Sequence, residues 1–425
     1  MSRIVFAAIA TPGHIFPILT IAKHLIGLRH QVTIFSGAVF QPLAVEIGAN
    51  FVAFDQQVDV DYRHLGEFFP ERDKLSAGNE QMAQGLMQFF AGPISILSKQ
   101  LMQLINENRA ELLVIDNTFY AALPLLQQAV TERIPVVAIG VTPLPWRAKD
   151  SVFWGAKIPP ERLPVDLTRE QLVDEATQAL IDQVRVTFSQ AIVKSGGKPL
   201  NKEHNEVLIE GVDCYLQLST QSFEFCYPDI PDHVEFIGML PVKLDKNHLK
   251  INWTDEKAPL VIVTQGTLAN IDFNQLVVPT LNALAHLPVR VLAVTGGRSA
   301  SFGRKGIPAN ARIVEYIDFE YWLPKASVFV TNGGYGSLTS AIRHGVPMVM
   351  AGVGDGKLEA ISRVVRACCG ISLQTDSPSE KQLLEAITEI LSSPLWRQQA
   401  QIMKEDSESY DALMSITSHV NRLLV

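Results

Sequence analysis

Short apolar runs alternate with helical stretches along most of this 425-residue chain, and this alternation constrains the fold more than any other feature. Parallel strands cannot be joined by a tight turn and need a crossover connection, usually a helix, so the pattern is typical of an α/β protein. In the first half, helices are predicted over residues 17–28 and 81–108, the second interrupted at Gly92 and Pro93. The predicted strands are residues 3–10, 31–36, 50–54, 111–116, 134–140, 213–219 and 234–238.

A second series of strands and helices follows a polar segment bounded by prolines, which predicts a second doubly wound domain. Its predicted strands are residues 259–264, 289–295, 312–317, 327–331, 346–352 and 370–374, and the tail from residue 380 is predicted to form two helices. We therefore expect an N-terminal Rossmann-like domain over residues 1–240, a linker over 241–258 and a C-terminal Rossmann-like domain over 259–395. Helices in residues 396–425 are expected to pack back toward the N-terminal domain.

The amino-acid composition limits the kinds of partner that this protein is expected to bind. Lys and Arg number 36 against 44 Asp and Glu, a formal net charge of −8, which argues against general electrostatic binding of nucleic acid or an anionic membrane. No uninterrupted apolar run reaches the ~20 residues of a membrane span. Four cysteines are too few and too poorly spaced for a disulfide framework or a zinc site. We expect a cytoplasmic protein without an integral membrane segment.

Two residues, one predicted to follow a strand and one predicted to end a neighbouring strand, carry the first candidate chemistry. Ligands of a doubly wound sheet collect outside the carboxyl ends of its strands, where the strand order reverses. His14 follows the first predicted strand and Asp116 ends the fourth, so the strand order 3-2-1-4-5 would make the two side chains face each other. A neutral imidazole, with an ordinary pKa near ~6.5, can take a proton from a hydroxyl, and a carboxylate behind it fixes its tautomer. The alternative is that His14 caps a helix beginning near Ile15 and that Asp116 is solvated.

The second candidate is a glycine-rich turn in the predicted C-terminal domain. A strand ends at Thr331, and a helix is predicted to begin near Ser337. Glycines let backbone approach a phosphate closely, and a helix N-terminus offers free N–H groups, so a diphosphate would fit there; the alternative is a tight turn that only needs positive φ. The turn consists of Asn332, Gly333, Gly334, Tyr335 and Gly336. Gln265, Gly266 and Thr267 follow another strand of this domain and could add donors to the same phosphates.

Two other nucleotide motifs are excluded. Residues 352–359, GVGDGKLE, are one residue short of the GxxxxGK phosphate loop, and Leu358 stands where Ser or Thr would hold magnesium. ATPGH after the first strand lacks the glycine spacing of a dinucleotide fingerprint, which disfavours a nicotinamide-dependent dehydrogenase.

With these residues identified, the chain resembles the inverting nucleotide-sugar transferases of the UDP-glycosyltransferase superfamily (glycosyltransferase family 1), particularly its bacterial small-molecule members. TPGHIFP resembles the segment that carries the family's catalytic histidine, IDNTFYAALPLL the segment with its partner aspartate, and VTPLPWRAKDSVFWG the acceptor-side loop. The segments VTQGT, YIDFEYWLP, VTNGGYGS, HGVPMVMAG and GDGKLEAISRVV follow in the order and spacing of the family's nucleotide-sugar region.

The resemblance implies a GT-B fold, in which two Rossmann-like domains face each other across a cleft, with His14 as base and Asp116 as its partner. It implies that Tyr316 stacks on the nucleotide base, that Ile317 pairs with it through the backbone, and that Asp355 or Lys357 contacts the sugar hydroxyls. The donor-binding set is Gln265, Gly266, Thr267, Tyr316, Ile317, Asn332, Gly333, Gly334, Gly336, Ser337, Asp355 and Lys357.

Three positions depart from the family pattern. Asn332 replaces the histidine usual at the start of the glycine-rich turn and keeps a hydrogen-bond donor without a positive charge. Ser340 stands where a glutamate commonly grips the ribose, which leaves the choice between UDP and dTDP donors open. Asp355 is followed by Gly356 and Lys357 rather than directly by the second member of the sugar-contacting pair, so the sugar is also left open.

The acceptor is expected in the N-terminal domain, between the interrupted helix and the following loop. The candidate residues are Phe89, Phe90, Trp146, Phe153 and Trp154. Their apolar side chains favour a lipophilic or aromatic alcohol, and the alternative is that they are core residues.

Together these observations predict an inverting, metal-independent transferase that moves a hexose from a UDP- or dTDP-sugar to a hydroxyl of a small molecule. It would need no cofactor beyond the nucleotide-sugar co-substrate, and a homodimer is left open. The main alternative is a non-catalytic GT-B-like protein that activates a partner glycosyltransferase, which the presence of both His14 and Asp116 disfavours. A sugar-nucleotide epimerase would share the architecture but would release its product without an acceptor.

Overall fold

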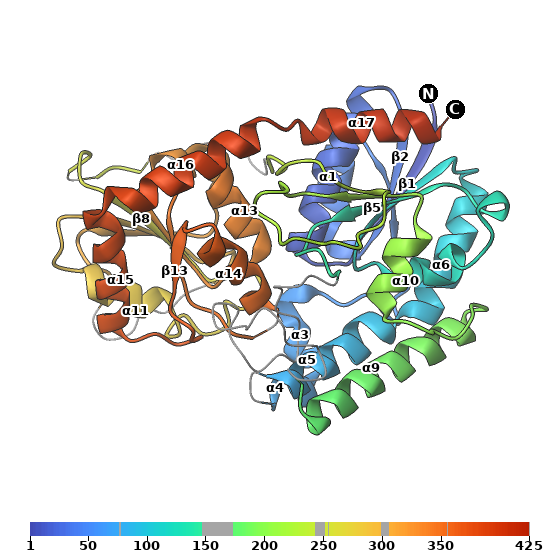
Figure 1. The fold of residues 1–425 in the computed structure, drawn as a ribbon, viewed down its shortest axis with the longest axis horizontal. Helices are drawn as coiled ribbons and strands as arrows, with labels where there is room; N and C mark the ends of the chain where they lie inside the picture. The colour runs from blue at the N-terminus through green and yellow to red at the C-terminus, as the bar shows by residue number, and fades with distance from the viewer. Residues whose placement is uncertain are drawn as a thin grey trace.

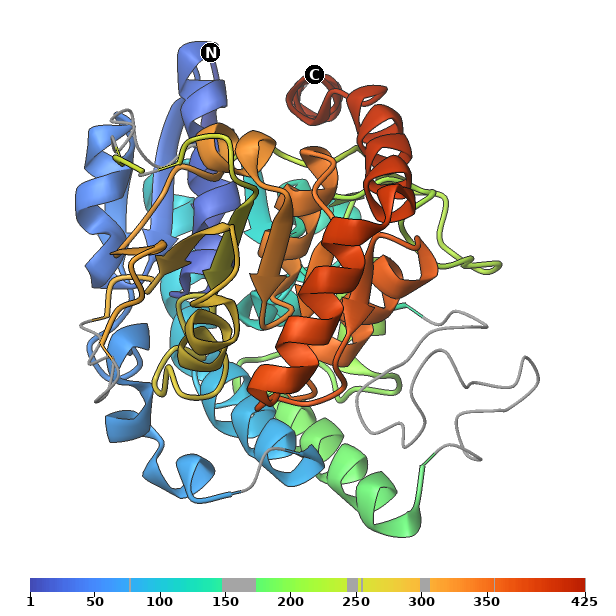
Figure 2. The ribbon, with the colours of Figure 1, turned by 90° about the vertical axis from the view of Figure 1, so that its left-hand side faces the viewer.

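Two α/β lobes lie side by side, one from each half of the chain (Figure 1). This computed structural model describes residues 1–75, 78–146, 173–242, 251–253, 255–298, 306–354 and 356–424. Both termini lie at the same end of the molecule (Figures 1 and 2). The predicted fold class, two doubly wound parallel-sheet domains, is confirmed.

The N-terminal domain contains a seven-stranded parallel sheet in the order β3-β2-β1-β4-β5-β6-β7. β1 and β4 are therefore neighbours, with Ala7 paired to Ile115 at their carboxyl ends. The strands are β1 (Arg3–Ala7), β2 (Gln31–Ser36), β3 (Asn50–Ala53), β4 (Leu112–Asp116), β5 (Val136–Gly140), β6 (Cys214–Gln217) and β7 (Val234–Phe236).

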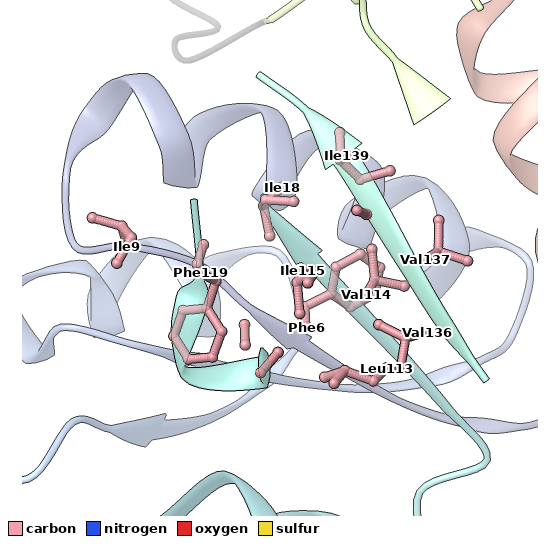
Figure 3. Close-up of a cluster of buried hydrophobic side chains, with 14 of the residues drawn as sticks. Phe6, Ile9, Ile18, Leu113, Val114, Ile115, Phe119, Val136, Val137 and Ile139 are labelled. Atoms are coloured by element: carbon pink, nitrogen blue, oxygen red, sulfur yellow. The ribbon is translucent and has the colours of Figure 1, made fainter. Parts of the chain in front are cut away.

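Helices on both sides of this sheet bury its strands. Residues of β1, β4 and β5 such as Phe6, Val114 and Val137 are at most 1% exposed, and Ile18 of α1 packs against them (Figure 3). Burial on both faces is why these strands are continuous apolar runs rather than alternating ones. The helices are α1 (Pro12–Gly27), α2 (Gln41–Glu46), α3 (Leu65–Phe68), α4 (Pro70–Asp73), α5 (Asn79–Gly85), α6 (Ile94–Glu107), α7 (Leu123–Leu126), α9 (Glu175–Lys194) and α10 (His204–Gly211).

The helices of the structure differ from the predicted ones in two details. Helix α1 begins at Pro12 rather than at residue 17, because proline is tolerated in the first turn, where its missing N–H has no partner to lose. The stretch over 81–108 is interrupted at Gly92 and Pro93 as predicted, but the turn before the break, η3 (Leu86–Ala91), is a π-helix. The N–H of Gly92 donates to the carbonyl of Met87 at 2.9 Å, five residues back.

The C-terminal domain contains a six-stranded parallel sheet in the order β10-β9-β8-β11-β12-β13. Its strands are β8 (Leu260–Thr264), β9 (Arg290–Val294), β10 (Ala311–Val314), β11 (Val328–Thr331), β12 (Met348–Met350) and β13 (Gly370–Ser372). Its helices are α11 (Val277–Leu284), α12 (Phe319–Trp322), α13 (Tyr335–Arg343), α14 (Lys357–Arg366), α15 (Glu380–Ser392) and α16 (Pro394–Glu408). The prediction of a strand to residue 317 was wrong, because β10 ends at Val314 and Asp318 begins the next helix by accepting the N–H of Glu320 at 2.9 Å.

The tail forms three helices rather than the two predicted. After α15 and α16, the carboxylate of Asp411 accepts the N–H of Met414 at 2.9 Å and caps a further helix, α17 (Ala412–Leu423). Helix α16 lies along the C-terminal domain, whereas α17 lies on the N-terminal domain beside α1 (Figure 1). There Thr417 is 2.8 Å from His24, and Ile416 and Val420 join the N-terminal core.

Candidate active site

A histidine and an aspartate meet at the carboxyl edge of the N-terminal sheet. His14 lies in the first turn of α1, which follows β1, and Asp116 is the last residue of the neighbouring strand β4. The Nδ1 of His14 is 3.1 Å from Oδ1 of Asp116. The His14 side chain is 17% exposed and that of Asp116 is fully buried, so the imidazole alone can reach a ligand.

The carboxylate of Asp116 is held by three further donors. Its Oδ2 accepts the N–H of Ile9 at 2.7 Å, and its Oδ1 accepts the N–H and the hydroxyl of Thr118 at 2.8 and 2.6 Å. Burial alone would raise the pKa of Asp116, but His14 and these hydrogen bonds hold the pKa below its ordinary value. An ionised Asp116 accepts a hydrogen bond from the N–H at Nδ1 of His14. This tautomer leaves Nε2 free to accept a proton.

Thr118 is a site residue that the sequence analysis missed. Its hydroxyl lies 3.0 Å from Nδ1 of His14 as well as 2.6 Å from Asp116, so it supports both members of the dyad. The available signal was its place two residues after Asp116 in the same strand-end segment.

A cavity of about 320 Å³ adjoins this dyad. Its wall includes Ile9, two residues before the N-cap of α1, and Phe119, the neighbour of Thr118, and both lie at the sheet edge drawn in Figure 3. The predicted acceptor residues Phe89 and Phe90 also line it. The full lining is Ile9, Ala10, Phe54, Gln57, Val58, Val60, Phe68, Phe69, Gln88, Phe89, Phe90, Gly92, Pro93, Ile94, Leu97, Phe119, Tyr120 and Ala121.

The other predicted acceptor residues are not part of this wall. Trp146 packs against the N-terminal core, and its indole N–H donates to the carbonyl of Asp229 at 3.2 Å. Phe153 and Trp154 lie outside the described residues.

In the C-terminal domain, loops after the three adjacent strands β8, β11 and β12 form one cluster. The amide of Asn332 donates to the carbonyl of Gln265 at 2.6 Å and so ties the turn after β11 to the loop after β8. Gly333 has φ +86°, and a Cβ there would lie 2.5 Å from Ile361 of α14. The turn therefore requires glycine at this position for both its backbone angle and its packing.

The residues predicted to bind the diphosphate differ in whether they are accessible to a ligand. The Gln265 side chain is engaged, since it donates to the carbonyls of Ala269 and Asp272 and accepts the N–H of Val277. Gly266 (φ +71°) and Thr267 follow it in a loop that is partly exposed. Gly334, Gly336 and Ser337 are not fully buried and occupy the cap and first turn of α13, where the N–H of Ser337 already donates to the carbonyl of Gly334 at 3.0 Å.

The predicted base-binding residues lie at the mouth between the domains. Tyr316 and Ile317 follow β10, and Tyr316 is 52% exposed. A Cβ at Gly297 would collide with the Tyr316 hydroxyl, so this glycine makes room for the ring. Tyr316 also approaches Tyr62 of the N-terminal domain, whose pKa is raised to about 12 by burial and by Tyr316.

Lys357 begins α14 beside the glycine-rich turn. Its Nζ is 3.8 Å from Oδ1 of Asp376, which also accepts the N–H of Val353, so Asp376 holds this loop and was not anticipated from the sequence. Asp355 lies outside the described residues. The Ser340 hydroxyl donates to the carbonyl of Gly336 within α13 at 2.7 Å.

A buried polar network joins the two domains next to these clusters. The hydroxyl of Tyr335, the first residue of α13, donates to Glu224 at 2.7 Å and accepts from Gln217 at the end of β6 at 3.1 Å. Glu224 also pairs with Arg363 of α14 at 2.6 Å, and both side chains are fully buried. The N-terminus of α13 thus lies against the carboxyl edge of the N-terminal sheet, on the same edge as the dyad.

Two Rossmann-like domains joined in this way, with clusters at the facing sheet edges, define a GT-B architecture. A family model described as "Erythromycin biosynthesis protein CIII-like, C-terminal domain" matches residues 279–422. "UDP-glycosyltransferase 2" from Phaeomoniella chlamydospora is 28% identical over 435 residues, 99% of this chain and 95% of that protein. "4'-demethylrebeccamycin synthase" from Lentzea aerocolonigenes is 28% identical over 429 residues, 100% of both chains.

The solved structure of the glycotransferase of kitacinnamycin has the same fold, with a TM-score of 0.73 at 20% identity over 100% of this chain and 99% of that chain. The chain is therefore similar to UDP-glycosyltransferases over nearly its whole length and has the fold of a solved glycosyltransferase.

Two features are absent from the described ranges. No helix there combines the length and the apolar character required to cross a bilayer. No three His, Cys, Asp or Glu side chains of those ranges come together as a metal-binding group.

Proposed function

We propose that the protein is an inverting glycosyltransferase that moves a sugar from a nucleoside-diphosphate donor to a hydroxyl of a neutral, lipophilic small molecule. The observation that carries this proposal is the His14–Asp116 dyad, whose carboxylate is hydrogen-bonded to Ile9 in the wall of an apolar cavity. The similarity of nearly the whole chain to UDP-glycosyltransferases supports it.

His14 acts as the general base. Asp116 keeps the proton on Nδ1, so Nε2 takes the proton of the acceptor hydroxyl while that oxygen attacks the anomeric carbon. The imidazolium that forms is stabilised by the buried carboxylate at 3.1 Å. General-base catalysis of this kind contributes about 10²- to 10⁴-fold to a rate.

The C-terminal domain stabilises the leaving group. As the new bond to the acceptor oxygen forms, the bond between the anomeric carbon and the diphosphate oxygen breaks, and negative charge develops on the diphosphate. The N–H groups of Gly334 and Gly336 supply hydrogen bonds, and the N-terminus of α13 supplies a partial positive charge for it. Attack from the face opposite the leaving group inverts the anomeric configuration. These backbone donors let the reaction proceed without a metal ion.

The donor is bound at the mouth of the C-terminal domain. Tyr316 is placed to stack on the base, with the backbone of Ile317 beside it, and Thr267 adds a hydroxyl near the diphosphate. Lys357, next to Gly333, contacts the sugar hydroxyls together with Asp355. Ser340, whose hydroxyl is bonded within its own helix, leaves the ribose to other groups, which is compatible with both UDP and dTDP.

The test is transfer by the isolated protein. Incubation with UDP- and dTDP-linked hexoses and a panel of polyketide, terpenoid and flavonoid alcohols should give a glycoside by mass spectrometry, with inverted configuration by NMR. A reaction without acceptor is the control, because an epimerase would turn over there. A product of retained configuration contradicts the mechanism. Transfer that occurs only when a partner transferase is added identifies the auxiliary protein instead.

A further inference from the structure

The first residue of α13 is bonded across the domain interface. Tyr335 begins this helix on the side of the C-terminal domain that faces the N-terminal domain (Figure 1). Its hydroxyl donates to Oε1 of Glu224 at 2.7 Å and accepts from Nε2 of Gln217 at 3.1 Å. Burial and the charge of Glu224 keep the pKa of this hydroxyl well above its usual range, so it remains a donor at neutral pH. Two residues of the N-terminal domain therefore hold the start of α13.

The hydrogen bonds continue from Gln217 along the carboxyl edge of the N-terminal sheet to the residue after Asp116. The Gln217 amide also donates to the carbonyl of Thr142 at 2.9 Å, and the amide of Asn117 donates to the Thr142 hydroxyl at 2.7 Å. Gly140, the last residue of β5, leaves space for this arrangement, because a Cβ there would collide with the Gln217 side chain. A short chain of hydrogen bonds thus connects the strand end that carries the dyad aspartate with the start of α13.

Other contacts hold the two domains together without the Tyr335 hydroxyl. Arg363 of α14 pairs with Glu224 at 2.6 Å, and Arg366 of the same helix donates to the carbonyl of Phe223 at 3.0 Å. Loss of the hydroxyl should leave these contacts in place and release only the start of α13. That part of the C-terminal domain is the one proposed above to hold the diphosphate. The hydroxyl therefore fixes one position within the interface rather than forming the interface.

We propose that Tyr335 is a positioning residue for sugar transfer: its hydroxyl fixes the start of α13, and with it the leaving diphosphate, at the distance from the His14–Asp116 dyad that the attack requires. This inference rests on the proposed function. Reacting groups must be closely aligned, and a misplacement of ~1 Å can cost ~10²-fold in rate. The N–H groups of Gly334 and Gly336 move together with the helix start, so kcat depends on the hydroxyl and nucleotide affinity does not.

Tyr335→Phe tests this proposal, and Tyr227→Phe is the matched control. Tyr227, in the N-terminal domain, donates to Oε2 of the same Glu224 carboxylate at 3.0 Å. Its substitution therefore also deprives Glu224 of one hydroxyl but leaves the bonds of Tyr335 in place. A second test variant, Gln217→Leu, removes the other bond to Tyr335 and keeps the one to Glu224. Steady-state kinetics give kcat and KM, calorimetry gives the Kd of UDP or dTDP, and thermal unfolding compares the stability of the variants.

We expect Tyr335→Phe to lower kcat about 10- to 100-fold while the Kd of the nucleotide is unchanged. Tyr227→Phe should lose a similar amount of stability with an unaltered kcat, and Gln217→Leu should lower kcat by less than Tyr335→Phe. Equal kcat for Tyr335→Phe and Tyr227→Phe would overturn this proposal and leave the proposed function standing. If Tyr335→Phe does not fold, a natural kcat in Gln217→Leu would overturn it instead. Absence of sugar transfer by the natural protein contradicts the proposed function and this inference with it.

Discussion

The N-terminal and C-terminal halves of the proposed site use different parts of the chain. On the N-terminal side, side chains carry the chemistry, and the carboxylate of Asp116 has four hydrogen-bond contacts around it. On the C-terminal side, the groups proposed to bind the diphosphate belong to the backbone of a turn and of the first turn of α13, whereas the side chains of Gln265 and Asn332 fix the loops. From this difference we expect that a side-chain substitution abolishes catalysis in the N-terminal half. In the C-terminal half, nucleotide binding should be weakened mainly by substitutions that add atoms to the glycines.

The largest effect on rate is expected for Asp116→Asn. The amide presents an N–H toward His14 in at least one orientation and disfavours the tautomer with a free Nε2, so kcat should fall by about 10³- to 10⁴-fold. Nucleotide affinity, measured by calorimetry, should be unchanged because it depends on the other half. Asp182→Asn, an exposed carboxylate on α9, makes the same chemical change outside the site and should leave kcat unaltered. A ten-fold loss or less for Asp116→Asn would show that its carboxylate is not needed to orient His14.

The next effect concerns the contact that aligns the two halves. Arg363→Met leaves Glu224 without its guanidinium partner in a fully buried site, and the free energy of unfolding should fall by about 3–5 kcal/mol. Urea denaturation measures this change. The double variant Glu224→Gln with Arg363→Met removes both charges and should recover part of the loss. If the single variant is as stable as the natural protein, the network does not hold the domains together.

A smaller effect is expected from one methyl group in the glycine-rich turn. Gly333→Ala imposes a side chain at φ +86° and against Ile361, which should cost about 1–3 kcal/mol of stability and weaken nucleotide binding. The matched variant Gly336→Ala places its methyl group in open space at the start of α13 and should not lower stability. Thermal unfolding with and without UDP or dTDP compares the two. Equal stability of both variants would contradict the packing argument.

The smallest effect is expected for Lys357→Met. The side chains of Lys357 and Asp376 are 16% and 27% exposed, so solvent weakens their interaction, and the main loss is one contact to the donor sugar. KM for the nucleotide sugar should rise about 3- to 10-fold with little change in kcat. Steady-state kinetics measure this, with the exposed Lys381→Met as control. A large fall in kcat at constant KM would assign Lys357 to the transition state instead.

The two sheets were predicted from the sequence more accurately than the first and last residues of individual helices. Apolar runs and crossover helices gave both parallel sheets, because double-sided burial makes such strands easy to recognise. The start of α1 was predicted too late because Pro12 and Gly13 resemble a turn, although proline is favourable in a first turn. The cap at Asp411 was overlooked, so the tail from residue 380 was predicted to form two helices instead of three.

Some residues of the candidate site could be predicted from the sequence and others could not. His14 and Asp116 could be related because His14 follows one strand and Asp116 ends another, and strand order then brings them to 3.1 Å. Thr118 and Glu224 could not be singled out, because each acquires its role from contacts that only the assembled chain creates. Trp146 was predicted from its place in a loop that resembles the family's acceptor-side loop, and its indole bonds to Asp229 instead of lining the cavity.

The most direct test of the central claim, that His14 is the base, is the transfer rate of His14→Ala measured beside its nucleotide affinity. The account predicts that transfer falls by at least about 10²-fold while UDP or dTDP binds as tightly as to the natural protein. Transfer at the natural rate by this variant would contradict the account.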